Sequence, residues 1–382
     1  MPPFHAISTQ GRRKALLIGI NYKWKSSEDF MPLNGPINDV NEMRKVLLEI
    51  YGYRDEDVVI MTDDDEAENT SSRWPTRCNI IVAIQQLVHG ARAGDSLVFH
   101  YAGHSWQTKA TLDQNEEDNM DEALITCDLQ WILDDDLRKY LVDPLPSRSR
   151  LTAIFDSCHS GTLLDLPHYH CNNFLSRISS HPIATPNPRI LQSNKRSQTL
   201  PAHILSKHFN GLPRASGRRA CKSRIVRLRN VVGAIIRLKT VTKKLDLAAV
   251  SPTQTGSVSF PKQQPICTRS CKYTYMEDGP IVISMSSCAD HQLAWENRKC
   301  QGAMTAALVR ILRQNPSITV SDLKQSLRTS LWDAACERYM YLRQEGSGGS
   351  PLAFDVQSPQ LGSLRRLSHN EQFIAEHERS IY

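Results

Sequence analysis

Two hydrophobic periods alternate along this chain, and their alternation limits the fold more than any other feature. Short runs rich in β-branched and aromatic residues, typical of buried strands, alternate with segments in which apolar residues recur every three to four positions, as on one face of a helix. Strands are predicted at residues 15–20, 58–62, 96–101, 151–155 and 281–284, and helices at 37–51, 79–88, 135–141, 302–313 and 320–332. Strands connected by helices run parallel, so the pattern predicts an α/β fold with a mostly parallel sheet flanked by helices on both faces.

Two of the predicted strands lead directly into residues that could form a catalytic pair. The segments LVFHYAGHS (97–105) and LTAIFDSCHSG (151–161) place His104 and Cys158 54 positions apart. Open parallel sheets carry their chemistry in loops at the carboxyl ends of the strands. A thiol with an ordinary pKa of ~8.5 is mostly protonated at neutral pH and needs a nearby base to act as a nucleophile. The sequence therefore predicts Cys158 as a nucleophile with His104 as its base, and the alternative is an inert buried cysteine beside an unrelated histidine.

The charge of the chain is distributed unevenly. Residues 166–245 contain no Asp or Glu but sixteen Lys and Arg, from Arg177 to Lys244, whereas the whole chain has a net charge of only +6. A basic insert thus interrupts an acidic unit. Its Pro, Ser and Asn content is typical of a poorly ordered linker, although residues 225–238 could form a basic amphipathic helix. An arm that binds nucleic acid or a membrane surface is the weaker alternative, because no aromatic residues are interleaved for base stacking.

The remaining composition predicts a protein of the cytoplasm, or of the nucleus. We also expect a monomer without an organic cofactor. Ten cysteines without CxxC pairs favour reduced thiols over a disulfide framework. No apolar run reaches eighteen residues, and the first ten residues lack an apolar core of the signal-peptide kind. Two clusters could bind zinc, but neither has the usual ligand spacing and a chance grouping is favoured. They are Cys267 with Cys271, and His168, His170 and Cys171.

Several segments of the chain resemble metacaspases, the caspase-related peptidases of fungi, plants and protists. The matching segments are KALLIGINY (14–22), NDVNEM (38–43), VIMTDDD (59–65), PTRCNI (75–80), GDSLVFHYAGH (94–104), DEALITCD (121–128) and RLTAIFDSCHSGTLLDLP (150–167), with a weaker match at 281–309. The resemblance implies a caspase-like fold. It divides the chain into a short N-terminal extension (1–11), a large-subunit-like catalytic region (12–167), the basic insert (168–278), a small-subunit-like region (279–360) and a C-terminal tail (361–382).

The resemblance also implies a cysteine endopeptidase that cleaves proteins or peptides after Arg or Lys. The catalytic residues of metacaspases match His104 and Cys158, and the two carboxylates that recognise the basic side chain match Asp39 and Asp156. Guanidinium and ammonium groups are buried well only when they are paired with negative charge. On sequence alone, Asp39 would equally suit charge compensation at a helix N-terminus.

Four positions depart from the metacaspase pattern. Pro36 and Ala102 replace a Cys and a Ser of the family pocket, and Ser105 and Trp106 replace two glycines after the histidine. By resemblance, the backbone N–H groups of Ser105 and Cys158 hold the oxyanion. Backbone donation survives most substitutions, but a glycine can be needed for its dihedral angles or for close approach of substrate. The alternative function is therefore a catalytically weakened or inactive relative that works as a binding or scaffold protein.

A calcium site is implied in the same way. Asp121, Asp134, Asp135 and Asp165 match the calcium-binding positions of metacaspases. Clustered carboxylates suit this hard cation, and micromolar to millimolar affinity would let it act as an activating switch. The alternative for the DDD run at 134–136 is a solvated helix start. The Arg-rich insert is where a peptidase specific for basic residues could cut its own chain.

Overall fold

The computed structural model describes residues 11–27, 29–64, 69–109, 120–158, 160–169, 171–172, 278–290, 292–297, 300–344, 356–368 and 370–375. Residues 173–277, which make up nearly all of the predicted basic insert, lie outside this part, and so do Cys267, Cys271 and His170 of the two candidate zinc clusters.

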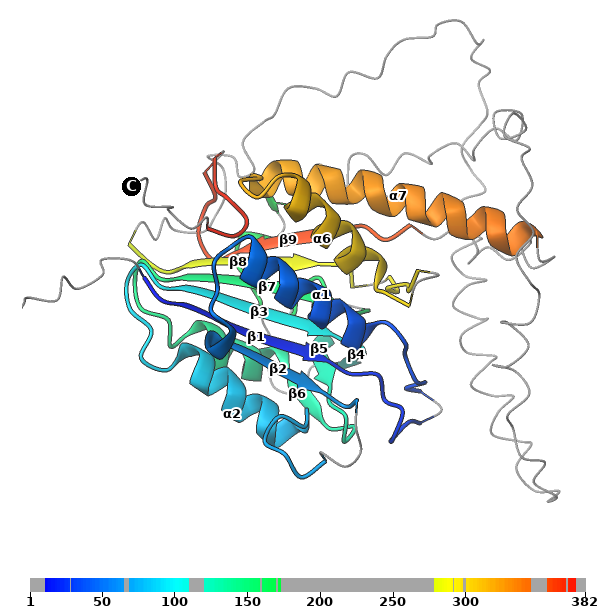
Figure 1. Cartoon of the computed structure of the whole chain (residues 1–382), viewed down its shortest axis with the longest axis horizontal. Helices are drawn as coiled ribbons and strands as arrows, with labels where there is room; N and C mark the ends of the chain where they lie inside the picture. The colour runs from blue at the N-terminus through cyan, green and yellow to red at the C-terminus, as the bar shows by residue number, and fades with distance from the viewer. Residues whose placement is uncertain are drawn as a thin grey trace, which may run out of the picture. The chain divides into compact units, whose positions relative to one another are not determined.

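A six-stranded sheet with the order β2-β1-β3-β7-β8-β9 forms the centre of the described structure (Figure 1). All neighbouring strands are parallel except β8 and β9. The strands are β1 (Arg13–Gly19), β2 (Val58–Thr62), β3 (Ser96–Ala102), β7 (Arg150–Asp156), β8 (Ile281–Ser286) and β9 (Gln360–Ser363). The five predicted strands are present, and the prediction of a mostly parallel sheet is confirmed.

Helices cover both faces of this sheet because side chains alternate along each strand. In β1, Leu16 and Ile18 enter one hydrophobic core, whereas Ala15 and Leu17 enter the other. The first core is closed by α2 (Arg77–Val88), α3 (Asp134–Leu137) and the π-helix Arg138–Val142; the second is closed by α1 (Pro36–Glu49), α6 (Ala303–Gln314) and α7 (Val320–Gln344). A 3-10 turn, Asp55–Asp57, precedes β2.

The helix boundaries follow local chemistry. Pro36 stands in the first turn of α1, where a missing N–H costs nothing, and the Thr76 hydroxyl caps α2 by accepting the N–H of Asn79 at 3.3 Å. The last helix differs from its prediction, since α7 runs to Gln344 instead of ending at residue 332. Its sequence contains no Gly or Pro before Gly346, so nothing local stops the helix once its apolar side has packed.

A second, antiparallel sheet was not predicted. It consists of β4 (Ser105–Lys109), β5 (Met120–Ile125) and β6 (Trp131–Leu133), in that order. The predicted C-terminal tail also differs from the structure, because β9 spans residue 361 and Leu361, Leu367 and Phe373 are buried in the second core. These apolar residues are too widely spaced in sequence to produce a periodic signal. No helix in the described ranges has both the length and the apolar character needed to cross a membrane.

Candidate active site

The sheet register brings the two predicted catalytic segments to the same edge. Strands β3 and β7 are neighbours, and Ala102, the last residue of β3, pairs with Asp156, the last residue of β7. His104 and Cys158 each follow two residues later. The N–H of Gly103 donates to the carbonyl of Asp156 at 3.4 Å, so the two chains are still joined as they leave the sheet.

The imidazole of His104 is oriented by a backbone carbonyl. Its Nε2 lies 2.7 Å from the carbonyl oxygen of Met31, which can only accept a hydrogen bond. Nε2 therefore carries the hydrogen, and Nδ1 is left as the basic nitrogen. The ring packs against Tyr22 and Phe30, with centroid separations of 4.6 and 5.6 Å. Burial lowers the pKa of His104, which favours the neutral imidazole.

Two tyrosines hold the backbone of His104. The hydroxyl of Tyr22 accepts the His104 N–H at 2.9 Å, and the hydroxyl of Tyr101 lies 2.6 Å from the His104 carbonyl. A Cβ atom at position 103 would lie only 2.8 and 2.9 Å from these hydroxyls. Glycine is therefore required at position 103 for close packing. No sequence motif predicted a role for the tyrosines or for Met31, although Tyr22 belongs to a segment that resembles metacaspases.

The thiol of Cys158 is held in a neutral state. Its sulfur accepts the N–H of Ala294 at 3.3 Å, and the Cys158 carbonyl accepts the hydroxyl of Ser105. Burial raises the pKa of Cys158, and the negative charge of Asp156 raises it further. The thiol at rest is therefore protonated and needs a base before it can act as a nucleophile.

The carboxylates of Asp39 and Asp156 meet at the start of α6. The N–H of Gly302 lies 3.1 and 2.9 Å from the two oxygens of Asp39, and the N–H of Thr305 donates to Asp156 at 2.8 Å. A Cβ atom on Gly302 would come within 2.1 Å of Asp156, so only glycine fits there. Both carboxylates thus lie at the positive end of a helix.

Burial gives these two carboxylates an unusual affinity for protons. It raises the pKa of Asp39 to about 9, and the neighbouring charge of Asp156 adds to the effect. Burial also raises the pKa of Asp156. Like charges held this close do not both ionise readily, so the pair retains a proton at neutral pH.

A third carboxylate, Glu296, borders the same place and was not predicted. Its Oε1 accepts the N–H groups of Asn34 and Gly35, at 2.9 and 2.8 Å, just before α1 begins. Its charge helps to raise the pKa values of Asp39 and Asp156. Glu296 lies within the weaker 281–309 match, but no motif there indicated that it would return to α1.

Three of the four predicted calcium ligands come together. Ligand oxygens of Asp134, Asp135 and Asp165 lie within 4.8 Å of one another. Asp121 is not in this group, but it is near enough to act on Asp134. Burial raises the pKa of Asp134 to about 6, and the negative charges of Asp121 and Asp135 contribute to the rise. The oxygens of Asp134 accept the N–H groups of Glu122 and Asp135, both at 2.8 Å. A cluster of carboxylate oxygens fits calcium, because this ion prefers hard oxygen ligands.

Hydrogen bonds connect this acidic cluster to the segment after Cys158. Glu122, next to Asp121 in β5, is buried, and its Oε2 accepts the hydroxyl of Thr162 at 2.6 Å. The N–H of Thr162 donates to Asp290 at 3.2 Å. Glu122, Thr162 and Asp290 were not predicted, because only the tertiary structure brings these three segments together.

Of the candidate zinc ligands, His168 and Cys171 belong to the described part of the chain. Cys171 Sγ lies 3.4 Å from His168 Nδ1. Within the described residues, however, the pair belongs to no group of three or more metal-binding side chains.

Comparison with known proteins identifies the family. A model of the metacaspase, peptidase C14 domain matches residues 13–167. Metacaspase-1 of Scheffersomyces stipitis is 36% identical over 334 residues, which cover 86% of this chain and 70% of that protein. Metacaspase-1 of Schizosaccharomyces pombe is 34% identical over 328 residues, covering 84% of this chain and 65% of that protein.

The chain thus spans about two thirds of the length of these relatives. Among solved structures, it is similar to Caspase-1 from Spodoptera frugiperda, with 10% identity, a TM-score of 0.42, and coverage of 97% of this chain and 92% of that one. On the strength of the sequence relatives, the chain belongs to the metacaspase family of cysteine peptidases.

Proposed function

We propose that the protein is a calcium-stimulated cysteine endopeptidase that cleaves after Arg or Lys. The observation that carries the proposal is that the buried carboxylates of Asp39 and Asp156 lie together. Asp156 stands two residues before Cys158 in the chain. Within the described residues, neither carboxylate forms an ion pair with Lys or Arg. A buried pair of this kind suits the cationic side chain of a substrate, which would displace its shared proton.

In the proposed mechanism, His104 acts first as a base and then as an acid. Its Nδ1 takes the proton of the Cys158 thiol while Nε2–H remains donated to the Met31 carbonyl. The thiolate attacks the scissile carbonyl and forms a thioester, and the imidazolium gives its proton to the leaving amine. The N–H groups of Ser105 and Cys158 stabilise the oxyanion, and water then releases the acid product.

Calcium would be held by Asp134, Asp135 and Asp165, with Asp121 nearby. The bound ion would supply positive charge that keeps these carboxylates together. Glu122 and Thr162 link that cluster to the segment after Cys158, which is a physical route from the ion to the nucleophile. We also propose that regions 12–167 and 279–360 act as the two halves of one catalytic unit.

The second candidate function is a catalytically weakened relative that acts as a scaffold. It is favoured by Ser105, which stands where the family pattern has a glycine. The Ser105 hydroxyl donates a hydrogen bond to the carbonyl of Cys158.

Hydrolysis of a fluorogenic peptide ending in Arg separates the two functions. The endopeptidase proposal expects hydrolysis that increases with millimolar calcium and is lost in Cys158→Ala and His104→Ala. The variant Cys78→Ala, at an exposed cysteine, serves as the matched control and should keep full activity. Peptide hydrolysis that is absent at all calcium concentrations would favour the scaffold.

A further inference from the structure

A carboxylate outside the proposed site holds the turn that follows β1. Asp63, one residue beyond β2, is almost fully buried. Its Oδ1 accepts the N–H of Asn21 at 2.7 Å, and its Oδ2 accepts the N–H of Tyr22 at 2.6 Å. Hydrogen bonds to an ionised carboxylate are among the stronger ones in proteins. Two of them therefore fix two consecutive peptide units.

The residue fixed in this way is strained. Tyr22 has a φ of +54°, in the left-handed region that residues with a side chain rarely adopt. Such a conformation persists only where the surroundings hold it in place, and it is often found at functional sites. Here the surroundings are the Asp63 carboxylate on the backbone and a set of hydrogen bonds on the side chain.

The side chain of Tyr22 reaches the proposed catalytic histidine. Its hydroxyl accepts the His104 N–H at 2.9 Å and donates to the Ile125 carbonyl at 2.6 Å. Its ring lies 4.6 Å from the imidazole, centroid to centroid. The place of the imidazole therefore depends on the unusual backbone of Tyr22, which depends on Asp63.

Asn21 extends the same support to the other side of the site. Its Oδ1 accepts the N–H of Ile37 at 3.3 Å, and its carbonyl accepts the N–H of Leu33 at 2.8 Å. Ile37 lies in the first turn of α1, just before Asp39, and Leu33 lies in the segment that leads into this helix. The buried carboxylate of Asp63 thus supports the turn after β1, and this turn contacts both His104 and the start of α1.

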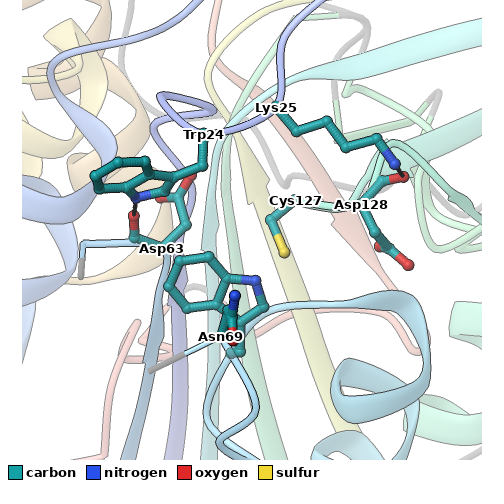
Figure 2. A pocket seen from close by; sticks show the side chains of 7 residues that line it. Trp24, Lys25, Asp63, Asn69, Cys127 and Asp128 are labelled. Atoms are coloured by element: carbon teal, nitrogen blue, oxygen red, sulfur yellow. Dashed lines mark hydrogen bonds between the residues drawn. The ribbon is translucent and has the colours of Figure 1, made fainter. Parts of the chain in front are cut away.

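The backbone of Asp63 is itself anchored beside a small cavity. Figure 2 shows the indole N–H of Trp24 donating to the Asp63 carbonyl, at 2.9 Å. The cavity encloses about 150 Å³ and is also lined by Trp74 and Cys127. Because the Trp24 bond adds to those of Asn21 and Tyr22, the carboxylate has little freedom to move away from the turn.

We infer that Asp63 is a positioning residue for catalysis: by holding Tyr22 in its left-handed conformation, it sets the place of His104 relative to Cys158. This inference rests on the proposed function, because it takes His104 and Cys158 to be the catalytic pair. It adds to that function a residue that contacts neither the substrate nor the reacting atoms.

Two variants and a control test the inference. Asp63→Asn loses one of the two hydrogen bonds, because its amide group meets a backbone N–H. Tyr22→Phe keeps the ring and loses only the hydroxyl. We expect each to lower kcat for an Arg peptide by about tenfold to a hundredfold, since misplacement of a catalytic group by 1 Å can cost that much. Tyr22→Phe should leave KM unchanged. Asp64→Asn, which neutralises the neighbouring exposed carboxylate, should match the wild type.

A second readout does not depend on peptide cleavage. The rate at which iodoacetamide alkylates Cys158, followed by mass spectrometry across pH, reports how well His104 activates the thiol. Both variants should lose reactivity near neutral pH and regain it only at higher pH. In the double variant, the fold decrease in kcat should be smaller than the product of the two single decreases, because both substitutions act through the same turn.

The inference is overturned if both variants keep the wild-type kcat and alkylation profile, or if their effects are fully independent. Should Asp63→Asn fail to fold, Tyr22→Phe alone decides the matter. If the wild type cleaves no Arg peptide, the proposed function fails, while the alkylation profile still decides the role of Asp63.

Discussion

At the scale of single residues, burial controls the chemistry of this protein. The thiol of Cys158 and the imidazole of His104 are both driven toward their neutral forms, the first by a raised pKa and the second by a lowered one. In the proposed mechanism, the proton therefore moves from the Cys158 sulfur to the His104 imidazole. The Met31 carbonyl prepares for this step, because it selects the tautomer in which Nδ1 is free to accept the proton.

The shared proton of Asp39 and Asp156 predicts a proton release when a substrate binds. A guanidinium pairs best with fully ionised carboxylates, so binding of an Arg peptide should expel the proton that the raised pKa of Asp39 retains at neutral pH. Calorimetry of an uncleaved Arg peptide binding to Cys158→Ala, in buffers of different ionisation enthalpy, measures this release. Asp39→Asn should reduce it. Binding without proton release between pH 6 and 8 would contradict the assignment.

The raised pKa of Asp39 also makes the stability of the protein depend on pH, and this contribution decreases as the pH rises. The folded-state pKa of Asp39, about 9, lies above the ordinary value of 3.8. Its contribution to stability is therefore complete below pH 4 and is lost as the pH rises through about 9. Thermal unfolding of Asp39→Asn should accordingly depend less on pH across this window than unfolding of the wild type.

At the scale of elements, strand register and helix starts assemble the site. β3 and β7 end at the same register position, so His104 and Cys158 emerge at the same edge of the sheet. Backbone N–H groups at the start of α6 donate to the carboxylates of Asp39 and Asp156. The antiparallel β5 contributes Glu122, which contacts the loop that follows Cys158. The acidic residues at the start of α3 lie next to this loop through Asp165.

We predict that the acidic cluster at α3 binds calcium. Asp165→Asn removes one charged ligand and should weaken calcium binding, measured by calorimetry, by about tenfold or more, since affinity at such sites depends on the number of charged ligands. Asp143→Asn, at an exposed residue paired with Arg138, is the matched control and should bind calcium as the wild type does. Equal affinities of the wild type and Asp165→Asn would remove these residues from the calcium site.

The C-terminal segment should contribute strongly to stability. Phe373 is completely buried in the core beneath α7 and α1. Phe373→Ala should lower the free energy of unfolding by about 3–5 kcal/mol in urea titrations, the usual cost of truncating a buried aromatic side chain. Val82→Ala, at an exposed position of α2, should change it by less than about 1 kcal/mol. A Phe373→Ala variant as stable as Val82→Ala would show that this segment is only a tail.

At the scale of the whole molecule, the chain combines an acidic catalytic unit with a strongly basic insert. All sixteen Lys and Arg of residues 166–245 lie between the two regions that supply the proposed site. His104, Cys158 and Asp39 come from before the insert, whereas Gly302 and Glu296 come from after it. Folding must therefore bring residues together across the insert, and cutting within it would not separate Cys158 from His104.

We predict that calcium triggers cleavage within the insert, between Arg177 and Lys244. Arg218, Arg219 and Lys222 are the proposed sites, because closely spaced basic residues suit a peptidase with the proposed Asp39 and Asp156 pocket. Terminal sequencing of the fragments should locate the cut, and chelation or Cys158→Ala should prevent it. Identical fragments from the wild type and Cys158→Ala would assign the cut to another protease.

The sequence by itself determined the parallel sheet and the candidate catalytic pair. Strand and helix periods are local signals, and the order in which they alternate is enough to predict parallel strands and the edge at which His104 and Cys158 emerge. The carboxylates Asp39 and Asp156 could be named only through resemblance, since a lone Asp at a helix start or at a strand end has several uses.

Only the tertiary structure decided what surrounds those residues. The Met31 carbonyl, the Asp63 carboxylate, Glu296 and the buried C-terminal segment all act across distances of tens to hundreds of positions in the chain. Such contacts leave no periodic pattern in the sequence. A backbone carbonyl has no sequence signature, and the sequence does not distinguish a buried carboxylate from a solvated one. Burial then sets the pKa values, and burial depends on how the whole chain folds.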